Sequence, residues 1–278
     1  MVALPAPRFR RPRWLSIPMG IGLAVVGFWL LATVLAPVMT MYDPLDLVGR
    51  RLQAPSWEHW LGTDTLGRDV FSRTLHGARN SLPIAVIVVT MAVVIGGALG
   101  AISGYVGGWT GAAIMRLVDI TLSFPPMLLA MAVAASLGPG LQNATVAMVI
   151  VWWPVYARLM RAQVLEVRER EHVEAAVVAG ASESRILFKH ILPLCWTPML
   201  VNATMDLGQV ILLAASLSFI GLGATPPTPE WGAMISDGAS QFYSWWVAFA
   251  PGAAILTIVL GFNFIGDGLH DYFDPRST

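Results

Sequence analysis

Four long stretches of this sequence contain no charged side chain, and they constrain the fold more than any other feature. They lie between Arg13 and Asp43, Arg79 and Arg116, Asp119 and Arg158, and Asp237 and Asp267. About 20 apolar residues cross the hydrocarbon of a bilayer as a helix, so each stretch can hold one span and the longer ones two. Only 12% of the residues are charged, against about 25% in a typical soluble domain. The chain is therefore predicted to be an all-α polytopic membrane protein.

The apolar runs and the breaks between them predict six membrane-spanning helices. The turn-forming segment LGPGLQN, residues 137–143, divides the third stretch, and Pro125 with Pro126 should kink the helix before it. The expected spans are residues 17–41, 81–106, 117–136, 143–164, 194–222 and 245–266. The first apolar run is too long for the core of a cleaved signal peptide, so it is expected to remain as a span.

The polar segments between the spans divide the chain further. Residues 1–16 should form a short amino-terminal segment. Residues 42–80 should form a loop followed by an amphipathic helix from about Thr65. Residues 81–278 should form the main body, with five spans and a polar loop at 166–193.

The distribution of arginine and lysine predicts the orientation. With the amino terminus inside, 12 of the 17 positive side chains fall on the cytoplasmic side, as the positive-inside rule requires. Both termini and residues 166–193 are then cytoplasmic. Five tryptophans near the expected outer span ends should act as interfacial anchors: Trp57, Trp60, Trp231, Trp245 and Trp246.

Glycine recurs every four residues at the end of the second span. Gly96, Gly100, Gly104 and Gly108 would share one helix face without side chains, which would let a second helix approach closely in the membrane. The alternative is four unrelated glycines in a glycine-rich chain.

One polar group lies inside an expected span. Asn202, Asp206 and Gln209 follow i, i+4 and i+7 spacing, so they share one face of the fifth span. An acid in hydrocarbon is costly, so Asp206 should face the bundle interior or a water-filled path. The group could line a route for a solute, or it could be a structural hydrogen-bond network with a neighbouring helix.

The stretch EHVEAAVVAGASESRILFKHILP, residues 171–193, carries three glutamates, an arginine, the single lysine and two histidines between two long apolar runs. A helix is expected from Glu166 to Ala179, with Glu166, Arg170 and Glu174 on one polar stripe. Gly180 should end that helix, and Ser182 could cap a second one running to about His190. This cytoplasmic helix–turn–helix could be a docking surface for a partner or a connecting loop.

Several chemistries are excluded or disfavoured. A phosphate-binding loop needs a lysine after a glycine-rich turn, and the single lysine, Lys189, follows Ile-Leu-Phe. The five histidines lack metal-ligand spacing, and the single cysteine, Cys195, makes a thiolate metal site improbable. We therefore expect no catalytic residue, bound metal or cofactor in this chain. A net charge of zero gives no indication of a nucleic-acid partner.

Residues 171–193 resemble the EAA loop of binding-protein-dependent ABC importer permeases. Glu174, Ala175, Ala176, Gly180, Leu192 and Pro193 are in register, and His190 stands at the isoleucine position of the pattern, as in the peptide and nickel branch. Three further blocks, residues 61–82, 216–232 and 261–276, are similar to the C-type permease of dipeptide, oligopeptide or nickel importers. Members of that family often carry an acid where this chain has Ala214.

The resemblance implies a type-I ABC importer permease in the bacterial cytoplasmic membrane. Residues 166–193 would then be the coupling helix, acting through Glu174, Ala175, Ala176, Gly180, His190, Leu192 and Pro193. The implied partners are a second permease, forming a heterodimer, two ABC ATPase subunits or one fused ATPase that hold ATP and Mg²⁺, and an extracytoplasmic solute-binding protein.

Three other readings stay open. The same importer class could carry nickel chelates instead of peptides. An ion-coupled secondary transporter could use Asp206, and a non-transporting scaffold could use the hairpin only to bind a partner.

Overall fold

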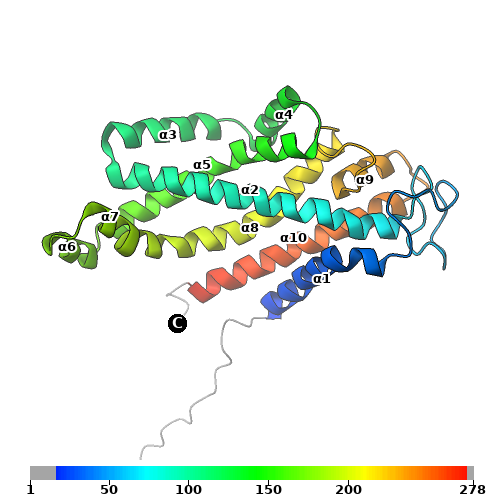
Figure 1. Cartoon of the computed structure of the whole chain (residues 1–278), viewed down its shortest axis with the longest axis horizontal. Coiled ribbons are helices and arrows are strands. Elements are labelled where there is room, and N and C mark those ends of the chain that lie inside the picture. Colours follow the sequence, from blue (N-terminus) through cyan, green and yellow to red (C-terminus); the bar gives the residue numbers. More distant parts are fainter. Residues whose placement is uncertain (1–16, 274–278) are drawn as a thin grey trace, which may run out of the picture.

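The computed structural model describes residues 17–273, which fold into helices without a β-strand in that range (Figure 1). The elements follow the order α1 (Ile17–Met39), α2 (Val70–Val106), α3 (Gly108–Leu122), α4 (Pro126–Leu137), α5 (Leu141–Arg168), α6 (Glu171–Val178), α7 (Glu183–Arg185), the π-helix η1 (Ile186–Ile191), α8 (Leu192–Phe219), α9 (Trp231–Ala239) and α10 (Trp246–Phe273).

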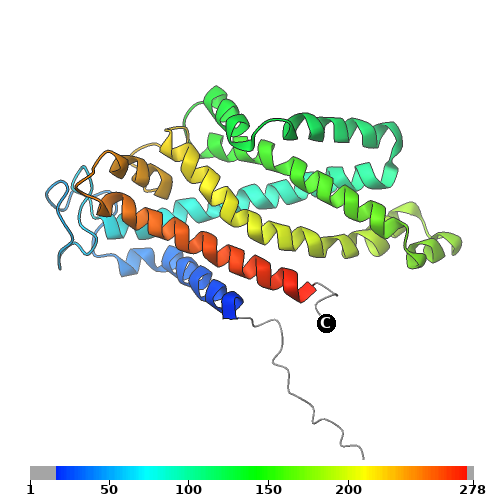
Figure 2. The ribbon, with the colours of Figure 1, turned by 180° about the vertical axis from the view of Figure 1, so that it is seen from behind.

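The long helices α2, α5, α8 and α10 run roughly along one axis and form the body of the bundle (Figure 1). Helix α1 packs against α10 and, to a smaller extent, α2. The short helices α6 and α7 lie at one end of the bundle, while α9 and the loop before α2 lie at the other, as the view from behind also shows (Figure 2). The two polar segments of the sequence are therefore separated by the length of the bundle.

The expected six spans agree only approximately with the helices. Among residues 17–273, four helical segments are long and apolar enough to cross a membrane: α1, α2, the run Glu183–Phe219 and α10. The pair α3 and α4 would add a fifth as a broken span. Helix α5 also has 28 residues, but Arg158, Arg161 and Arg168 make its second half polar.

Two expected span boundaries are wrong. The amphipathic segment and the second span form one 37-residue helix from Val70 to Val106, and Pro83 lies inside it without ending it. The expected third span, 117–136, is divided between α3 and α4, whose axes differ by 91°. The residue before a proline avoids the helical region, and tandem prolines therefore end α3 and start a new helix at Pro126.

The closest helix contact in the body joins α2 to α5. A Cβ on Gly96 or Gly100 would collide with the backbone carbonyl of Trp153 or Ala157, and one on Gly104 would lie 3.0 Å from the Val164 side chain. Gly108 lies outside this row, because α2 ends at Val106 and a Cβ there would meet nothing within 4 Å. Three of the four glycines therefore lie in one close contact between helices.

The predicted interfacial position is wrong for two of the five tryptophans. Trp231 is fully buried, and its indole donates to the Thr74 carbonyl at 2.9 Å. Trp246 is also buried and donates to the Thr63 carbonyl at 3.2 Å. Trp231 thus holds α9 to α2, and Trp246 holds α10 to the loop before α2, whereas Trp57, Trp60 and Trp245 are exposed.

Candidate functional site

The segment after α5 folds into a hairpin that projects from one end of the bundle (Figure 1). The continuous helix expected from Glu166 to Ala179 is broken, because α5 ends at Arg168 and Arg170 is extended. Val167 and Val173 are both buried in the core, although residues six apart in one α-helix point about 120° apart. The break lets both valines face the core. Arg170 still pairs with Glu166 at 2.8 Å. Glu174 lies on a different helix from Glu166, so the expected polar stripe of all three residues is wrong.

Gly180 shapes the elbow of the hairpin. Its φ is +75°, a conformation that glycine adopts without steric cost. The Gly180 N–H donates to the Val177 carbonyl at 3.0 Å, and the Ala181 N–H donates to the Ala176 carbonyl at 3.1 Å. This pair of bonds is a Schellman motif, which ends α6 and turns the chain back.

The outer surface of α6 mixes acidic and small apolar side chains. Glu174 and Ala175 are exposed and Ala176 is half-buried, while Val177 and Val178 are 56% and 84% exposed. Nothing within 4 Å would meet a Cβ on Gly180. The elbow is therefore open to a second molecule, and two valines there have no core to pack against.

A groove of about 670 Å³ lies between this hairpin and the end of α2, lined by Tyr105, Val106, Arg168, Glu169, Val173, Glu174, Val177, Ala181, Glu183 and Ile186. The Tyr105 hydroxyl donates to the Glu183 carbonyl at 3.2 Å. The Arg168 guanidinium donates to the Tyr105 carbonyl, also at 3.2 Å. The hairpin is thus attached to α2 as well as to α5 and α8.

The second half of the hairpin differs from expectation. Ser182 stands at the start of α7, but its side chain makes no capping bond to the helix. Helix α7 has only three residues, and η1 follows it directly and continues into α8 without a loop. His190 is half-buried near the end of η1, and Leu192 and Pro193 begin α8, where a proline is tolerated because the first N–H groups have no helical partner.

The structure separates the three polar residues of α8. Asp206 is buried and accepts a hydrogen bond of 2.7 Å from the Tyr156 hydroxyl of α5. Asn202 is half-buried, and Gln209 is exposed. Asp206 therefore faces the α5–α8 contact, whereas the Gln209 side chain points away from the core.

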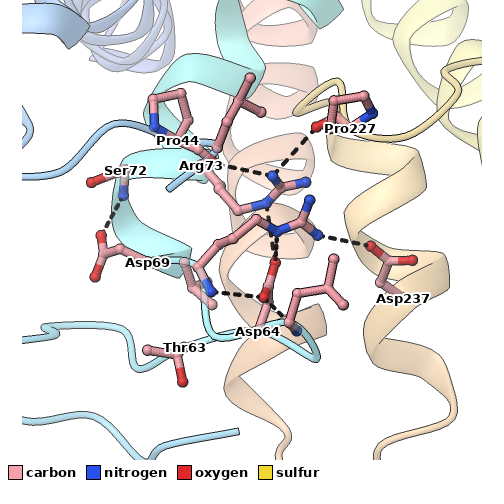
Figure 3. Close-up of polar contacts among 12 residues, drawn as sticks. Pro44, Thr63, Asp64, Asp69, Ser72, Arg73, Pro227 and Asp237 are labelled. Atoms are coloured by element: carbon pink, nitrogen blue, oxygen red, sulfur yellow. Dashed lines mark hydrogen bonds and ion pairs between the residues drawn. The ribbon is translucent and has the colours of Figure 1, made fainter. Parts of the chain in front are cut away.

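A polar network at the opposite end was missed by sequence reasoning. Its centre is the buried Asp64, which accepts bonds from the Arg68 side chain at 2.6 Å and from the Leu66 and Arg68 N–H groups (Figure 3). Arg73 adds an ion pair with Asp64 at 3.4 Å and donates to the Pro44 carbonyl at 3.0 Å. The block LGTDTLGRDVFSR was the available signal, because its charges are closely spaced within an apolar chain.

The network also joins elements distant in sequence. Arg73 donates to the Pro227 carbonyl at 3.5 Å, and Arg68 lies 3.8 Å from Asp237 on α9 (Figure 3). Partial burial raises the pKa of the Asp237 carboxyl, although Arg68 and Arg73 act in the opposite direction. Asp69 caps α2 by accepting the Ser72 N–H at 2.8 Å, and its other oxygen lies 3.0 Å from His59 Nδ1. These contacts tie the loop before α2, residues 40–69, to α2, to α9 and to the segment that carries Pro227.

No group of three or more His, Cys, Asp or Glu side chains is arranged to hold a metal ion among residues 17–273. Cys195 is buried, and its thiol donates to the Ile191 carbonyl. The candidate site is the exposed surface of the hairpin, together with helix α8, which continues directly from it.

Comparisons with known proteins identify relatives of this chain. Residues 96–278 match the family model described as binding-protein-dependent transport system inner membrane component. The chain is 46% identical over 258 residues to the dipeptide transport system permease protein DppC of Alkalihalophilus pseudofirmus, covering 92% of this chain and 85% of that protein. It is also 46% identical to the probable D,D-dipeptide transport system permease protein DdpC of Escherichia coli, covering 91% and 86%.

A third relative has a different solute in its name. The glutathione transport system permease protein GsiD of Pectobacterium atrosepticum is 43% identical over 257 residues, covering 91% of this chain and 83% of that protein. Among solved structures, the fold is similar to a chain of the inward-facing MetNI methionine ABC transporter. The TM-score is 0.59 at 22% identity, covering 73% of this chain and 97% of that one.

Proposed function

The chain belongs to the binding-protein-dependent transport system inner membrane components, and from this premise we propose how it works as the permease subunit of an ATP-driven peptide importer. The family is one of transport permeases and not of enzymes. The chain therefore contributes a route through the membrane, and ATP hydrolysis belongs to partner subunits.

The hairpin of α6, α7 and η1 is the proposed binding site for a cytoplasmic ATPase subunit. Its exposed valines, its open elbow at Gly180 and the acidic Glu174 form a surface that no other part of residues 17–273 covers. The hairpin leads without a loop into α8, so a displacement of the hairpin is transmitted to a membrane-spanning helix. This direct connection is the observation that carries the proposal.

The proposed solute is a short peptide. The relatives named above are permeases for dipeptides, D,D-dipeptides and glutathione, which are small zwitterionic or anionic solutes with amide groups. Gln209 on α8 is exposed and can exchange hydrogen bonds with an amide. Nickel chelates remain the second candidate within the same importer class.

The proposed assembly is a heterodimer with a second permease, two ATPase subunits or one fused ATPase, and an extracytoplasmic solute-binding protein. We place the hairpin and both chain termini in the cytoplasm, on the basis of the arginine and lysine distribution. Residues 1–16 and 274–278 lie outside the described range, so the placement of the termini rests on the sequence alone.

Uptake into proteoliposomes tests this proposal. The complete complex is reconstituted with its binding protein, and uptake of a labelled dipeptide is followed with ATP present, with ATP absent, and after an ionophore collapses ion gradients. Uptake that requires ATP and survives the ionophore supports the importer. Uptake that ignores ATP and stops with the gradient supports the ion-coupled alternative, for which Asp206→Asn should then abolish transport.

A substitution at the elbow then tests the coupling role. Gly180→Trp should abolish ATP-driven uptake while the protein remains in the membrane, because the bulky ring occupies the surface where the partner binds. Gly180→Asn is the matched control, since asparagine tolerates a positive φ better than other side chains and is much smaller. Loss of uptake with both variants, or with neither, contradicts the assignment.

A further inference from the structure

The π-helix η1 joins the hairpin to α8 at the point where any movement of the hairpin must pass. The Leu192 N–H donates to the Leu187 carbonyl, five residues earlier, which is the bonding pattern of a π-helix. Such turns are rare, occur mostly as single turns within α-helices, and are frequent at functional sites.

The burial pattern of the apolar residues explains the π-turn. Ile191, Cys195 and Met199 are fully buried at intervals of four, so they form one stripe of an α-helix against the core. The preceding buried residue is Ile186, five positions before Ile191. Residues five apart in an α-helix point about 140° apart, whereas a turn with i→i+5 bonds brings them nearly to one face. The π-turn therefore keeps Ile186 on the stripe.

The neighbouring residue offers a second solution. In a regular α-helix the stripe of Ile191, Cys195 and Met199 would be continued by Leu187, four positions earlier. Leu187 is apolar and half-buried, and it already packs against the core. The sequence thus has an apolar side chain for either register, Ile186 with the π-turn or Leu187 with a continuous α-helix.

We propose that Ile186 and Leu187 are alternating positioning residues, and that η1 converts between a π-turn and an α-turn during transport. When Leu187 replaces Ile186 on the buried stripe, the hairpin rotates by about 100° relative to α8 and shifts by about 1.5 Å along the helix axis. The ATPase subunits would drive this exchange through the hairpin. The inference deepens the proposed function and rests on it, since it assigns the step that carries the partner's motion into α8.

Deletion of Phe188 should prevent the exchange between the π-turn and the α-turn. Phe188 is 68% exposed, and its deletion places Ile186 four residues before Ile191, so the stripe is satisfied by a regular α-helix with the hairpin in its present orientation. In the reconstituted complex this variant should still assemble and hydrolyse ATP. Dipeptide uptake should fall about 5-fold to 150-fold, the range of typical allosteric couplings. Phe188→Ala is the reference for this comparison, because it removes the same side chain at unchanged length, so a loss of uptake beyond its level comes from the shortened turn.

A distance measurement separates this role from a merely structural one. Spin labels are placed at His172→Cys near the start of α6, eight residues before Gly180, and at Leu200→Cys on α8, because both positions are exposed. Cys195 is buried and does not react with the label. The complex should show one distance without nucleotide and a second with a non-hydrolysable ATP analogue, and the Phe188 deletion should show only the first. Uptake at the parent level after the deletion, or an unchanged distance in the parent complex, would overturn the proposal.

A variant of unchanged length covers the case in which the deletion does not assemble. Leu187→Ser disfavours the α-turn most, because Leu187 would lie on the buried stripe there and is only half-buried in the π-turn. It should lose the second distance and the uptake together; retention of both contradicts the inference. If the parent complex itself shows no ATP-driven uptake while Gly180→Trp still binds the ATPase, the proposed function fails instead. The two failures are therefore distinguishable.

Discussion

The Tyr156 hydroxyl on α5 donates a 2.7 Å hydrogen bond to the Asp206 carboxylate on α8, in the buried contact between the two helices. Tyr156→Phe removes the donor and leaves a buried acceptor without it, which should lower the unfolding free energy by about 1–3 kcal/mol. The midpoint of thermal unfolding in detergent measures this loss.

The partner residue provides the matched test. A double-mutant cycle of Tyr156→Phe and Asp206→Asn should show a coupling energy between the two positions, because they are in direct contact. Additive effects of the two substitutions would mean that the bond does not hold α5 to α8. Asp206 would then be free to serve another role.

Two adjacent glycines of α2 should respond differently to the same substitution. Gly96→Ala should strongly destabilise the fold, because the added methyl group meets the backbone carbonyl of Trp153 on α5, which cannot move without separating the helices. Gly97→Ala is the control, since its Cβ would lie 3.5 Å from the flexible end of Met199, an ordinary contact. The amount of folded protein extracted from the membrane, by size-exclusion chromatography, compares them; equal yields would contradict this packing.

The polar network around Asp64 should depend on this carboxylate. Asp64→Asn leaves the buried Arg68 and Arg73 side chains without their shared carboxylate, and breaking a buried ion pair typically costs about 3–5 kcal/mol. Asp237→Asn should cost much less at neutral pH, because the Asp237 side chain is 44% exposed and 3.8 Å from Arg68. Denaturant unfolding measures the loss of stability in both variants. A larger loss for Asp237→Asn than for Asp64→Asn would show that Asp64 is not the central residue of the network.

Asp237 should also give the fold a small pH dependence. Because partial burial raises its pKa, the folded chain holds this proton more tightly than the unfolded chain does. The stabilisation is then fully present below the ordinary aspartate pKa of about 3.9 and is lost as the pH rises through the raised value. Asp237→Asn should remove this contribution to the dependence of the unfolding free energy on pH. Parallel curves of unfolding midpoint against pH for the parent and the variant would show that Asp237 does not titrate in this way.

Residue patterns along single helices were the most predictable part of this fold. The charge-free stretches indicated the long helices, because a bilayer requires about 20 apolar residues per crossing. The spacing of Gly96, Gly100 and Gly104 indicated a close helix contact, and Gly180 indicated the end of α6. In each case the signal is local, since it depends on neighbours within one or two helical turns.

Features that depend on tertiary contacts could not be predicted in this way. Nothing local ends a helix at Arg168, and the break there follows from the burial of Val167 and Val173 against the same core. Trp231 looks like an interfacial anchor until its indole is seen to donate to Thr74 on α2. The π-turn of η1 likewise follows from a five-residue step between two buried isoleucines, which only burial reveals.

The central claim is that the hairpin of α6, α7 and η1 binds an ATPase. The most direct test is purification of the full-length chain from its native membrane in mild detergent, with every co-purifying protein identified, in parent and Gly180→Trp forms. The account predicts a second permease and an ATPase with the parent chain, and loss of the ATPase alone with Gly180→Trp. A parent chain that purifies without an ATPase yet supports peptide uptake in proteoliposomes would contradict it.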